Sequence, residues 1–327
     1  MEAEEPKRVL RLGSANMHLT KRKKFQEFLL IMEHWIRADI CGVVESWIKD
    51  DGQVIREDLK DSEFQWFGKD RKRRRGGGVG FLVRKNVQAR VINSKSENLM
   101  WLVIQERLYL AVVYLIPHDK GEENEDTLQE LQEDILRFRD KGEVVVLGDF
   151  SCRIGASSNL IATDKSEDAE VLEIPRRSED KVLHLQGRNL LGKLNAVDMV
   201  LMNGVNNLAQ YTSYQSTGNS VIDLFWVEYR SVKRVSEVIV WNHEMEILGD
   251  HRIVTMDYQW ELVKEQKKVR RESGLENGVR AAEKRPLSWR KRVRDEDWKA
   301  FREILSDEMK EKRNEGEEER SARTKRG

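Results

Sequence analysis

The sequence predicts a layered α/β or α+β domain in which two β-sheets lie between outer helices. Three observations favour this class. Short apolar segments with strand character outnumber the segments with helical spacing. Their order along the chain is too irregular for a strict alternation of strand and helix, and the body of the chain contains no internal repeat. We expect this folded body to extend over residues 1–262.

Apolar alternation or continuous apolar runs predict the strands. They are residues 9–14, 40–44, 79–83, 87–91, 100–104, 108–114, 143–147, 199–202, 221–227, 235–241 and 251–258. Apolar residues at helical spacing predict helices over 25–36, 127–138 and 182–194. The glycine run at 76–78 predicts a flexible turn, and 156–178 is polar and irregular.

Composition excludes several classes of protein. The 327 residues carry 58 Lys+Arg and 58 Asp+Glu, so any phosphate-binding surface must be local rather than the result of bulk charge. The sequence contains no run of about 18 apolar residues that could span a membrane, and its acidic start lacks the apolar core of a secretory signal. The apolar neighbours of Cys41 favour a reduced, buried thiol over a disulfide with Cys152. We therefore expect an intracellular protein.

The charge density changes near residue 262. Residues 261–327 contain 21 Lys+Arg and 16 Asp+Glu in 67 positions, so more than half of them are charged. Such a composition predicts a charged, largely flexible tail over 263–327. Within it, Trp298, Phe301, Ile304 and Leu305 recur at spacings of three and four, which predicts a short amphipathic helix over 295–309. This helix either docks on a partner or forms only transiently.

Chemically capable side chains occur at the ends of the apolar strands. They are Asn16 and Glu45 after the first two strands, Tyr114 at the end of 108–114, Asp149 and Ser151 after 143–147, Asp223 within 221–227, and Asp250 with His251 at the start of 251–258. A single carboxylate in such a place is most often a helix cap or a solvated turn, so the argument depends on the whole set. Asp223 is an exception, because a carboxylate among apolar neighbours is costly unless it is paired or binds a cation.

This set of residue types suits metal-assisted hydrolysis of a phosphodiester. Mg²⁺ is usually held by one or two carboxylates together with substrate phosphate and water, and a further carboxylate can position or deprotonate the water. A histidine held by an aspartate can stay protonated and meet phosphate oxygens. The sequence has no HExxH, no paired CxxC and no GxxxxGK[ST], so a zinc protease, a zinc finger and a phosphate-binding loop have no support.

Seven motifs in order resemble the endonuclease/exonuclease/phosphatase superfamily. They are Asn16, Val44-Glu45-Ser46-Trp47, Gly77-Gly78-Val79-Gly80-Phe81-Leu82-Val83, Val113-Tyr114, Gly148-Asp149-Phe150, Ser220-Val221-Ile222-Asp223 and Gly249-Asp250-His251-Arg252. Over residues 8–260 the chain most resembles the apurinic-endonuclease-like domains of LINE-type (non-LTR) retrotransposons. Residues 177–180, 187–188 and 201–204 look like the middle of those domains, and the segment around 289–305 resembles the spacer before their reverse transcriptase.

The resemblance implies a deoxyribonuclease-I-like four-layer sandwich, with two facing sheets flanked by helices and an active site at one end of the sheets. Glu45, Asp250 and Asn16 would hold Mg²⁺, with Mn²⁺ as an alternative. Asp149 would orient or activate water. Tyr114 and His251 would contact the scissile phosphate, and Asp223 would hold His251. We expect Asn16, Glu45, Asp149, Asp223, Asp250 and His251 to cluster in one cleft.

The implied reaction is a nick in DNA that leaves a 3′ hydroxyl, which primes reverse transcription in a retroelement. The implied partners are DNA and a reverse transcriptase domain that this chain does not contain, and we expect a nuclear monomer. Three departures from the family pattern predict reduced or lost activity: Ser151 stands where Asn is usual, Ala15-Asn16-Met17 stands where Trp-Asn-Val is usual, and Gly249 stands where Ser is usual. The alternatives are a catalytically weakened nucleic-acid-binding module and a phosphatase of the same superfamily.

A basic run precedes the glycines and is a candidate DNA contact. It consists of Arg71, Lys72, Arg73, Arg74 and Arg75. Arginine can bind phosphates through two parallel hydrogen bonds, so we favour phosphate contact over a solvated loop or a nuclear import signal. Residues 211–219 could form a hairpin that probes a groove, but an ordinary polar turn is the favoured interpretation.

Overall fold

The computed structural model describes residues 8–17, 22–47, 57–69, 77–117, 121–162, 170–241 and 249–260. The chain divides after Lys264, close to the expected boundary at residue 262, and all the described residues belong to the first unit. The basic run at 71–75 and the predicted helix over 295–309 lie outside the described residues. Among the described helices, none is both long enough and apolar enough to cross a membrane.

The first sheet has six strands, and two neighbouring parallel strands in it carry Asn16 and Glu45 at their ends. Its order is β15 (Val235–Val240), β16 (Val254–Trp260), β1 (Arg8–Asn16), β2 (Ile40–Val44), β4 (Val79–Arg84) and β3 (Phe64–Lys69). β1 and β2 are parallel, and Asn16 pairs with Val44. Because parallel strands end at the same edge of a sheet, Asn16 and Glu45 emerge side by side.

The second sheet also has six strands and places three polar residues in register. Its order is β11 (Met199–Leu201), β14 (Asp223–Glu228), β8 (Glu143–Asp149), β7 (Leu108–Tyr114), β6 (Leu99–Ile104) and β5 (Ala89–Ile92). Tyr114 on β7 pairs with Asp149 on β8, which in turn pairs with Asp223 on β14. One row across three neighbouring strands therefore carries three of the predicted site residues.

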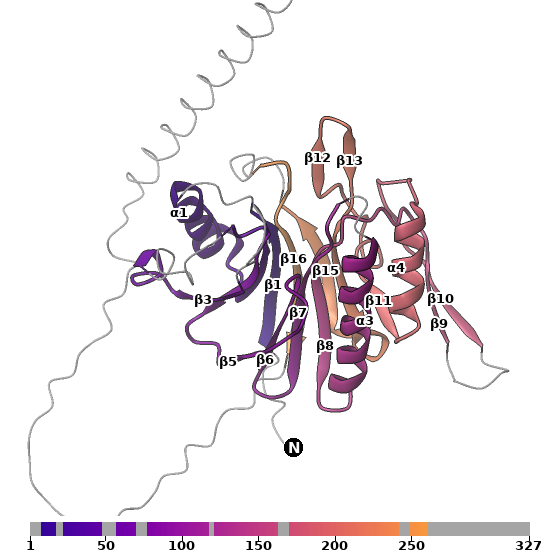
Figure 1. Cartoon of the computed structure of the whole chain (residues 1–327), viewed down its shortest axis with the longest axis horizontal. Coiled ribbons are helices and arrows are strands. Elements are labelled where there is room, and N and C mark those ends of the chain that lie inside the picture. Colours follow the sequence, from indigo (N-terminus) through magenta and orange to yellow (C-terminus); the bar gives the residue numbers. More distant parts are fainter. Residues whose placement is uncertain are drawn as a thin grey trace, which may run out of the picture. The chain divides into compact units, whose positions relative to one another are not determined.

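The two sheets face each other and helices cover their outer faces, which gives four layers (Figure 1). The helical segments are α1 (Arg22–Leu30), η1 (Ile31–Ile36), α3 (Gly121–Phe138), α4 (Leu185–Asn195) and η2 (Tyr229–Arg234). Strand β8 shows why both faces are covered: Val145 and Leu147 belong to the core between the sheets, whereas Val144 and Val146 pack with Leu131 of α3. The predicted fold class and its four-layer arrangement are confirmed.

Some elements differ from the sequence-based expectation. The segment predicted to be irregular contains the paired strands β9 (Asn159–Ala162) and β10 (Val171–Ile174), and β3 was not predicted. The polar turn favoured for residues 211–219 was wrong, because β12 (Ser213–Gln215) and β13 (Gly218–Ser220) form a hairpin that projects from the body in Figure 1. These strands are short and polar, so they lack the apolar alternation from which a strand is predicted.

Candidate active site

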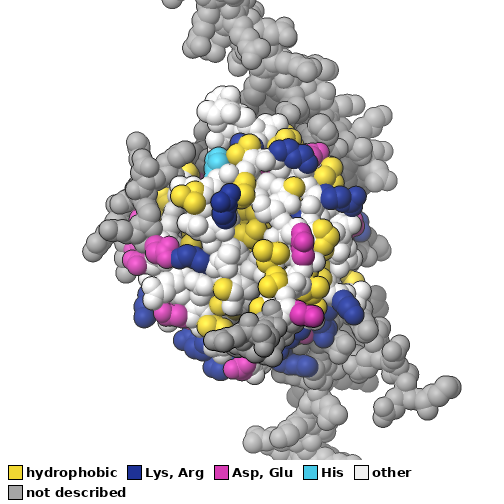
Figure 2. Space-filling view, turned by 90° about the vertical axis from the view of Figure 1, so that its right-hand side faces the viewer, with side chains coloured by type: hydrophobic (Ala, Val, Ile, Leu, Met, Phe, Trp, Pro, Cys, Tyr) yellow, Lys and Arg dark blue, Asp and Glu magenta, His cyan; other side chains and the backbone are white. Residues whose placement is uncertain are grey.

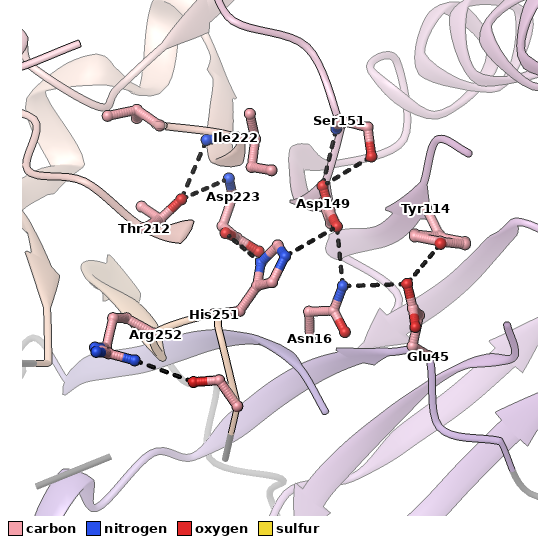
Figure 3. A network of polar contacts seen from close by, with 12 residues as sticks. Asn16, Glu45, Tyr114, Asp149, Ser151, Thr212, Ile222, Asp223, His251 and Arg252 are labelled. Carbon is pink, nitrogen blue, oxygen red and sulfur yellow. Dashed lines mark hydrogen bonds and ion pairs between the residues drawn. The ribbon is translucent and has the colours of Figure 1, made fainter. Parts of the chain in front are cut away.

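Seven of the predicted site residues meet at one end of the two sheets (Figure 3): Asn16, Glu45, Tyr114, Asp149, Ser151, Asp223 and His251. Asp250 directly precedes His251 in the chain and acts on the pKa of His251 through its charge. Asn16 and Glu45 come from the first sheet, and Tyr114, Asp149 and Asp223 come from the second. His251 lies in the segment that precedes β16, although the sequence predicted that this strand would begin at residue 251. The segment bends away because His251 pairs instead with Ser213 at the base of the hairpin.

A continuous line of polar contacts runs through Asp149. Asn16 Nδ2 donates to Asp149 Oδ2 over 3.0 Å, and His251 Nε2 lies 3.9 Å from the same oxygen. The other imidazole nitrogen of His251, Nδ1, lies 2.9 Å from Asp223 Oδ2. Asp149, Asp223 and His251 are each at most 5% exposed, so little solvent screens these charges.

Glu45 receives donors on both of its carboxylate oxygens. The Tyr114 hydroxyl donates to Oε1 over 2.6 Å, and the indole nitrogen of Trp47 donates to Oε2 over 3.3 Å. Asn16 Nδ2 lies 3.5 Å from Oε1 and so links Glu45 to the contacts of Asp149. The sequence placed Trp47 in a motif but assigned it no role, because only the fold shows that its indole turns back to Glu45.

The turn that carries Glu45 has an unusual backbone. Glu45 and Trp47 have φ values of 51° and 52°, in the left-handed region that bulky residues rarely adopt. The glycines at the start of β4 support this turn, since Ser46 N donates to Gly78 O and Trp47 N donates to Gly77 O. A Cβ on Gly78 would lie 2.5 Å from Ser46 Oγ. Strain of this kind is often found at functional sites.

Ser151 also has a left-handed backbone, with a φ of 46°. Its amide nitrogen donates to Asp149 Oδ1 over 2.8 Å, and its hydroxyl lies 3.3 Å from the same oxygen. Asparagine tolerates this conformation better than serine, and its amide has two donors where the hydroxyl has one. The main-chain contact to Asp149 is therefore present with serine, whose side chain is shorter than that of asparagine and carries no amide.

Burial and charge shift the pKa values of Asp149 and His251. Burial raises the pKa of Asp149, and the nearby Asp223 adds to this, while His251 opposes it. Burial would lower the pKa of His251, but the charge and hydrogen bond of Asp223, with Asp149 and Asp250, outweigh it and raise that pKa well above its usual range. The neighbouring carboxylates therefore favour the protonated imidazole of His251, which carries positive charge inside the site.

Asp250 and Glu45 share an electrostatic neighbour that the sequence did not reveal. Burial lowers the pKa of Lys24, on α1, and the charges of Asp250 and Glu45 partly offset that shift. A Cβ on Gly249 would lie 3.6 Å from Lys24 Nζ, so the lysine reaches the loop just before Asp250. In the sequence, Lys24 belongs to a basic run at the start of a helix, a pattern that is typical of a solvated helix end.

The donor set fits a hard divalent cation. Asn16 Oδ1 is buried and has no hydrogen-bond partner among the described residues, and it belongs to the same side chain that contacts Glu45 and Asp149. A buried acceptor without a partner is costly, and carboxylate and amide oxygens are the ligands that Mg²⁺ prefers. Asp149, Asp223 and His251 also offer ligand atoms within 4.8 Å of one another, but the His251–Asp223 contact already engages two of these side chains.

A family model matches part of the chain. Residues 108–255, which carry Tyr114, Asp149, Asp223 and His251, match the model of a family described as endonuclease-reverse transcriptase. The predicted likeness to the endonuclease/exonuclease/phosphatase superfamily is confirmed for these residues, which make up a little less than half of the chain. No curated protein matches its sequence.

Solved structures of this superfamily share the fold at low identity. A 3′–5′ exonuclease (NExo) from Neisseria meningitidis is 16% identical, with a TM-score of 0.56 over 77% of this chain and 100% of that one. The endonuclease domain of TRAS1, a telomere-specific non-LTR retrotransposon, is 13% identical, with a TM-score of 0.55 over 77% and 99%. The AP endonuclease LMAP from Leishmania major is 12% identical, with a TM-score of 0.56 over 78% and 89%.

Proposed function

We propose that this chain is a Mg²⁺-dependent DNA endonuclease of retrotransposon origin that nicks one strand and leaves a 3′ hydroxyl. The observation that carries the proposal is the line of contacts from Glu45 through Asn16 and Asp149 to His251 and Asp223. These side chains come from segments far apart in the sequence and supply both carboxylate oxygens and a buried positive charge. The likeness of the fold to the TRAS1 endonuclease domain supports the retroelement origin.

Glu45, Asp250 and Asn16 are the residues that would hold the cation. Mg²⁺ bound there would neutralise charge on the scissile phosphate and favour departure of the O3′ atom. Tyr114 and Trp47 limit rotation of the Glu45 carboxylate by donating to its two oxygens. Mn²⁺ takes the same oxygen ligands and should substitute for Mg²⁺.

Asp149 is the residue that would position the attacking water and accept its proton. Its raised pKa makes it a stronger base than an ordinary aspartate. Asn16 and the Ser151 amide fix the two oxygens of Asp149 in direction, so a water bound to it has a defined line of attack. The water would give its proton to Asp149 and form the new bond to phosphorus, while the bond from phosphorus to O3′ would break and O3′ would take up a proton from solvent.

His251 would contact the phosphate itself, and Tyr114 would do so by turning its single hydroxyl hydrogen from Glu45 to a phosphate oxygen. His251 is protonated and held through Nδ1 by Asp223, which leaves its Nε2–H as a charged donor. Such a donor stabilises the negative charge that develops on the phosphate oxygens in the transition state. Asp223 therefore acts through His251, as a positioning residue that also keeps the imidazole charged.

DNA contact beyond the scissile phosphate is assigned to Arg71, Lys72, Arg73, Arg74 and Arg75. The run comes just before Gly77 and Gly78, which support the turn of Glu45, so its attachment point lies beside the site. On the face beside α4, acidic and basic side chains are interspersed with apolar ones, which does not favour DNA binding there (Figure 2). A DNA substrate also agrees with a nuclear location.

A weakened enzyme is the second candidate, and Ser151 is the observation that favours it. Its hydroxyl reaches only Asp149 among the described residues, so the substrate contacts that an asparagine amide would make are missing. In this case the chain would bind DNA and turn over slowly.

A plasmid-nicking assay with Mg²⁺ against EDTA tests the proposal. Wild-type protein should convert supercoiled plasmid to the open-circle form with Mg²⁺ only, and Glu45→Ala should not. Glu106→Ala is the matched control, because Glu106 is exposed and pairs with Arg90 away from the site. Equal nicking by wild type and Glu45→Ala would overturn the site assignment. DNA binding without nicking by wild type would favour the weakened enzyme.

A further inference from the structure

Strand β14 carries Asp223 at its first position, where it lacks a partner strand on one side. On the other side Asp223 pairs with Asp149 of β8. The neighbour β11 ends at Leu201, whose partner on β14 is Trp226. The main chain around Asp223 therefore depends on other groups to satisfy its donors and acceptors.

Thr212 takes the place of the missing strand for two amide groups. Its hydroxyl oxygen accepts from the backbone N–H of Ile222 and from that of Asp223, each over 3.1 Å, and Thr212 is fully buried (Figure 3). A hydroxyl oxygen has two acceptor lone pairs, so these two donors use its full capacity. The hydroxyl thus fixes the peptide from which the Asp223 side chain projects.

The same residue also holds the segment of His251. The backbone oxygen of Thr212 accepts from Arg252 N over 2.8 Å, and Tyr214 N donates to Asp250 O over 2.7 Å. The guanidinium of Arg252 lies 4.6 Å from the centre of the Tyr214 ring, which adds a cation–π contact. Thr212 N donates to Ser220 O and so anchors the base of the β12–β13 hairpin.

We propose that Thr212 is a positioning residue that sets the contact between Asp223 and His251 by binding the main chain of both. Its side chain fixes the Asp223 peptide, and its carbonyl group fixes the residue that follows His251. The 2.9 Å contact between Asp223 and His251 joins segments 28 residues apart, and Thr212 lies on a third segment that touches both.

The hydroxyl, rather than the bulk of the side chain, carries this role. Thr212→Val keeps the shape but leaves the Ile222 and Asp223 amides without an acceptor, so the start of β14 should shift. A displacement of the order of 1 Å in a catalytic pair costs on the order of 10²-fold in rate. Thr212→Ser keeps the acceptor and should restore both the contact and the rate.

The test uses the full chain and two readouts, because the kinetic one rests on the proposed function. The first readout is the downfield proton resonance of His251 Nδ1–H in protein labelled with ¹⁵N-histidine, assigned with His251→Gln. We expect this resonance in wild type and Thr212→Ser, and its loss in Thr212→Val. The second readout is nicking, where kcat should fall at least tenfold in Thr212→Val while KM for DNA changes less than about twofold.

Controls separate positioning from general loss of stability. Thr127→Val also buries a valine in place of a hydrogen-bonded threonine, on α3, and should leave both readouts unchanged. Thr212→Ala is measured alongside, in case the valine variant does not fold. An unchanged His251 resonance in the folded valine or alanine variant overturns the inference, and so does a serine variant that behaves like valine. If wild type does not nick DNA, the proposed function fails while the resonance still decides the role of Thr212.

Discussion

The imidazole nitrogen Nδ1 of His251 lies 2.9 Å from Oδ2 of Asp223, and the two residues are 5% and 0% exposed. The aspartate keeps a buried imidazole charged, which burial alone would prevent. The other ring nitrogen of His251, Nε2, lies 3.9 Å from Asp149 Oδ2, so the protonation states of His251, Asp223 and Asp149 depend on one another.

Asp223→Asn should lower the nicking rate by about 10²-fold or more, because a neutral amide no longer favours the charged imidazole. Affinity for DNA should change little, since Asp223 is fully buried and does not reach solvent. Single-turnover nicking and a separate binding titration with EDTA present measure the two effects. A variant that loses both in parallel would indicate a misfolded site rather than a neutral imidazole.

Ser151→Asn should raise the nicking rate several-fold. Asparagine tolerates the left-handed backbone at this position and adds an amide that can reach the substrate. Ser151→Ala is the opposite control and should lower the rate, since it removes the hydroxyl but keeps the amide contact to Asp149. If asparagine lowers activity below that of serine, the surroundings of residue 151 have adapted to the smaller side chain.

Trp47→Phe should weaken the apparent affinity for Mg²⁺ by roughly fivefold, the effect expected of one hydrogen bond worth about 1 kcal/mol. The phenyl ring keeps the shape but cannot donate to Glu45 Oε2. The Mg²⁺ dependence of nicking measures this change. Trp241→Phe provides the comparison, because it removes an indole bond to Thr255 instead. A shift of the same size in both variants would mean that Trp47 has no specific role.

Asp180→Asn should lower the free energy of unfolding at pH 7 by about 3 kcal/mol, because it breaks a buried ion pair. Asp180 is fully buried and accepts from Arg153 Nε and Nη2 and from the amides of Val182 and Val221. Burial opposes ionisation, but these donors outweigh it and lower the pKa of Asp180.

The difference in the free energy of unfolding between wild type and Asp180→Asn should depend on pH, because the pKa of Asp180 is lowered in the folded protein. A carboxyl with a lowered pKa stabilises the fold above its unfolded pKa of about 3.9, and this contribution is lost as the pH falls through the lower folded value. Urea unfolding of wild type and Asp180→Asn at pH 7 and below pH 3 should therefore show the gap narrowing in acid. A gap that widens in acid would contradict the assignment.

Strands that are buried on both faces could be predicted closely from the sequence. Ile40–Val44 and Leu108–Tyr114 have the bounds that their apolar runs indicated. The strand Phe64–Lys69 was missed because its residues do not alternate and include a glycine. The β12–β13 hairpin was not the favoured interpretation because its strands are three residues long and polar.

The polar residues of the site could be selected from the sequence because they lie at the ends of predicted strands. Their roles remain predictions. The contacts of Lys24 and Thr212 could not be predicted, since each connects segments that only the fold brings together. The contact of Trp47 with Glu45, two residues away, depends on the left-handed backbone of that turn, which the sequence does not show. A hydroxyl that binds two amides ten and eleven residues away leaves no periodic trace in the sequence.

The pairing of Tyr114, Asp149 and Asp223 across β7, β8 and β14 makes the site sensitive to the length of the strand that carries Asp149. Side chains alternate between the faces of a strand, so inserting or deleting one codon within β8 would turn Asp149 towards the outer helices and bring an apolar residue opposite its neighbours. A change in length of one residue would therefore remove Asp149 from the row in a single step, whereas a substitution changes one side chain and leaves the row in register.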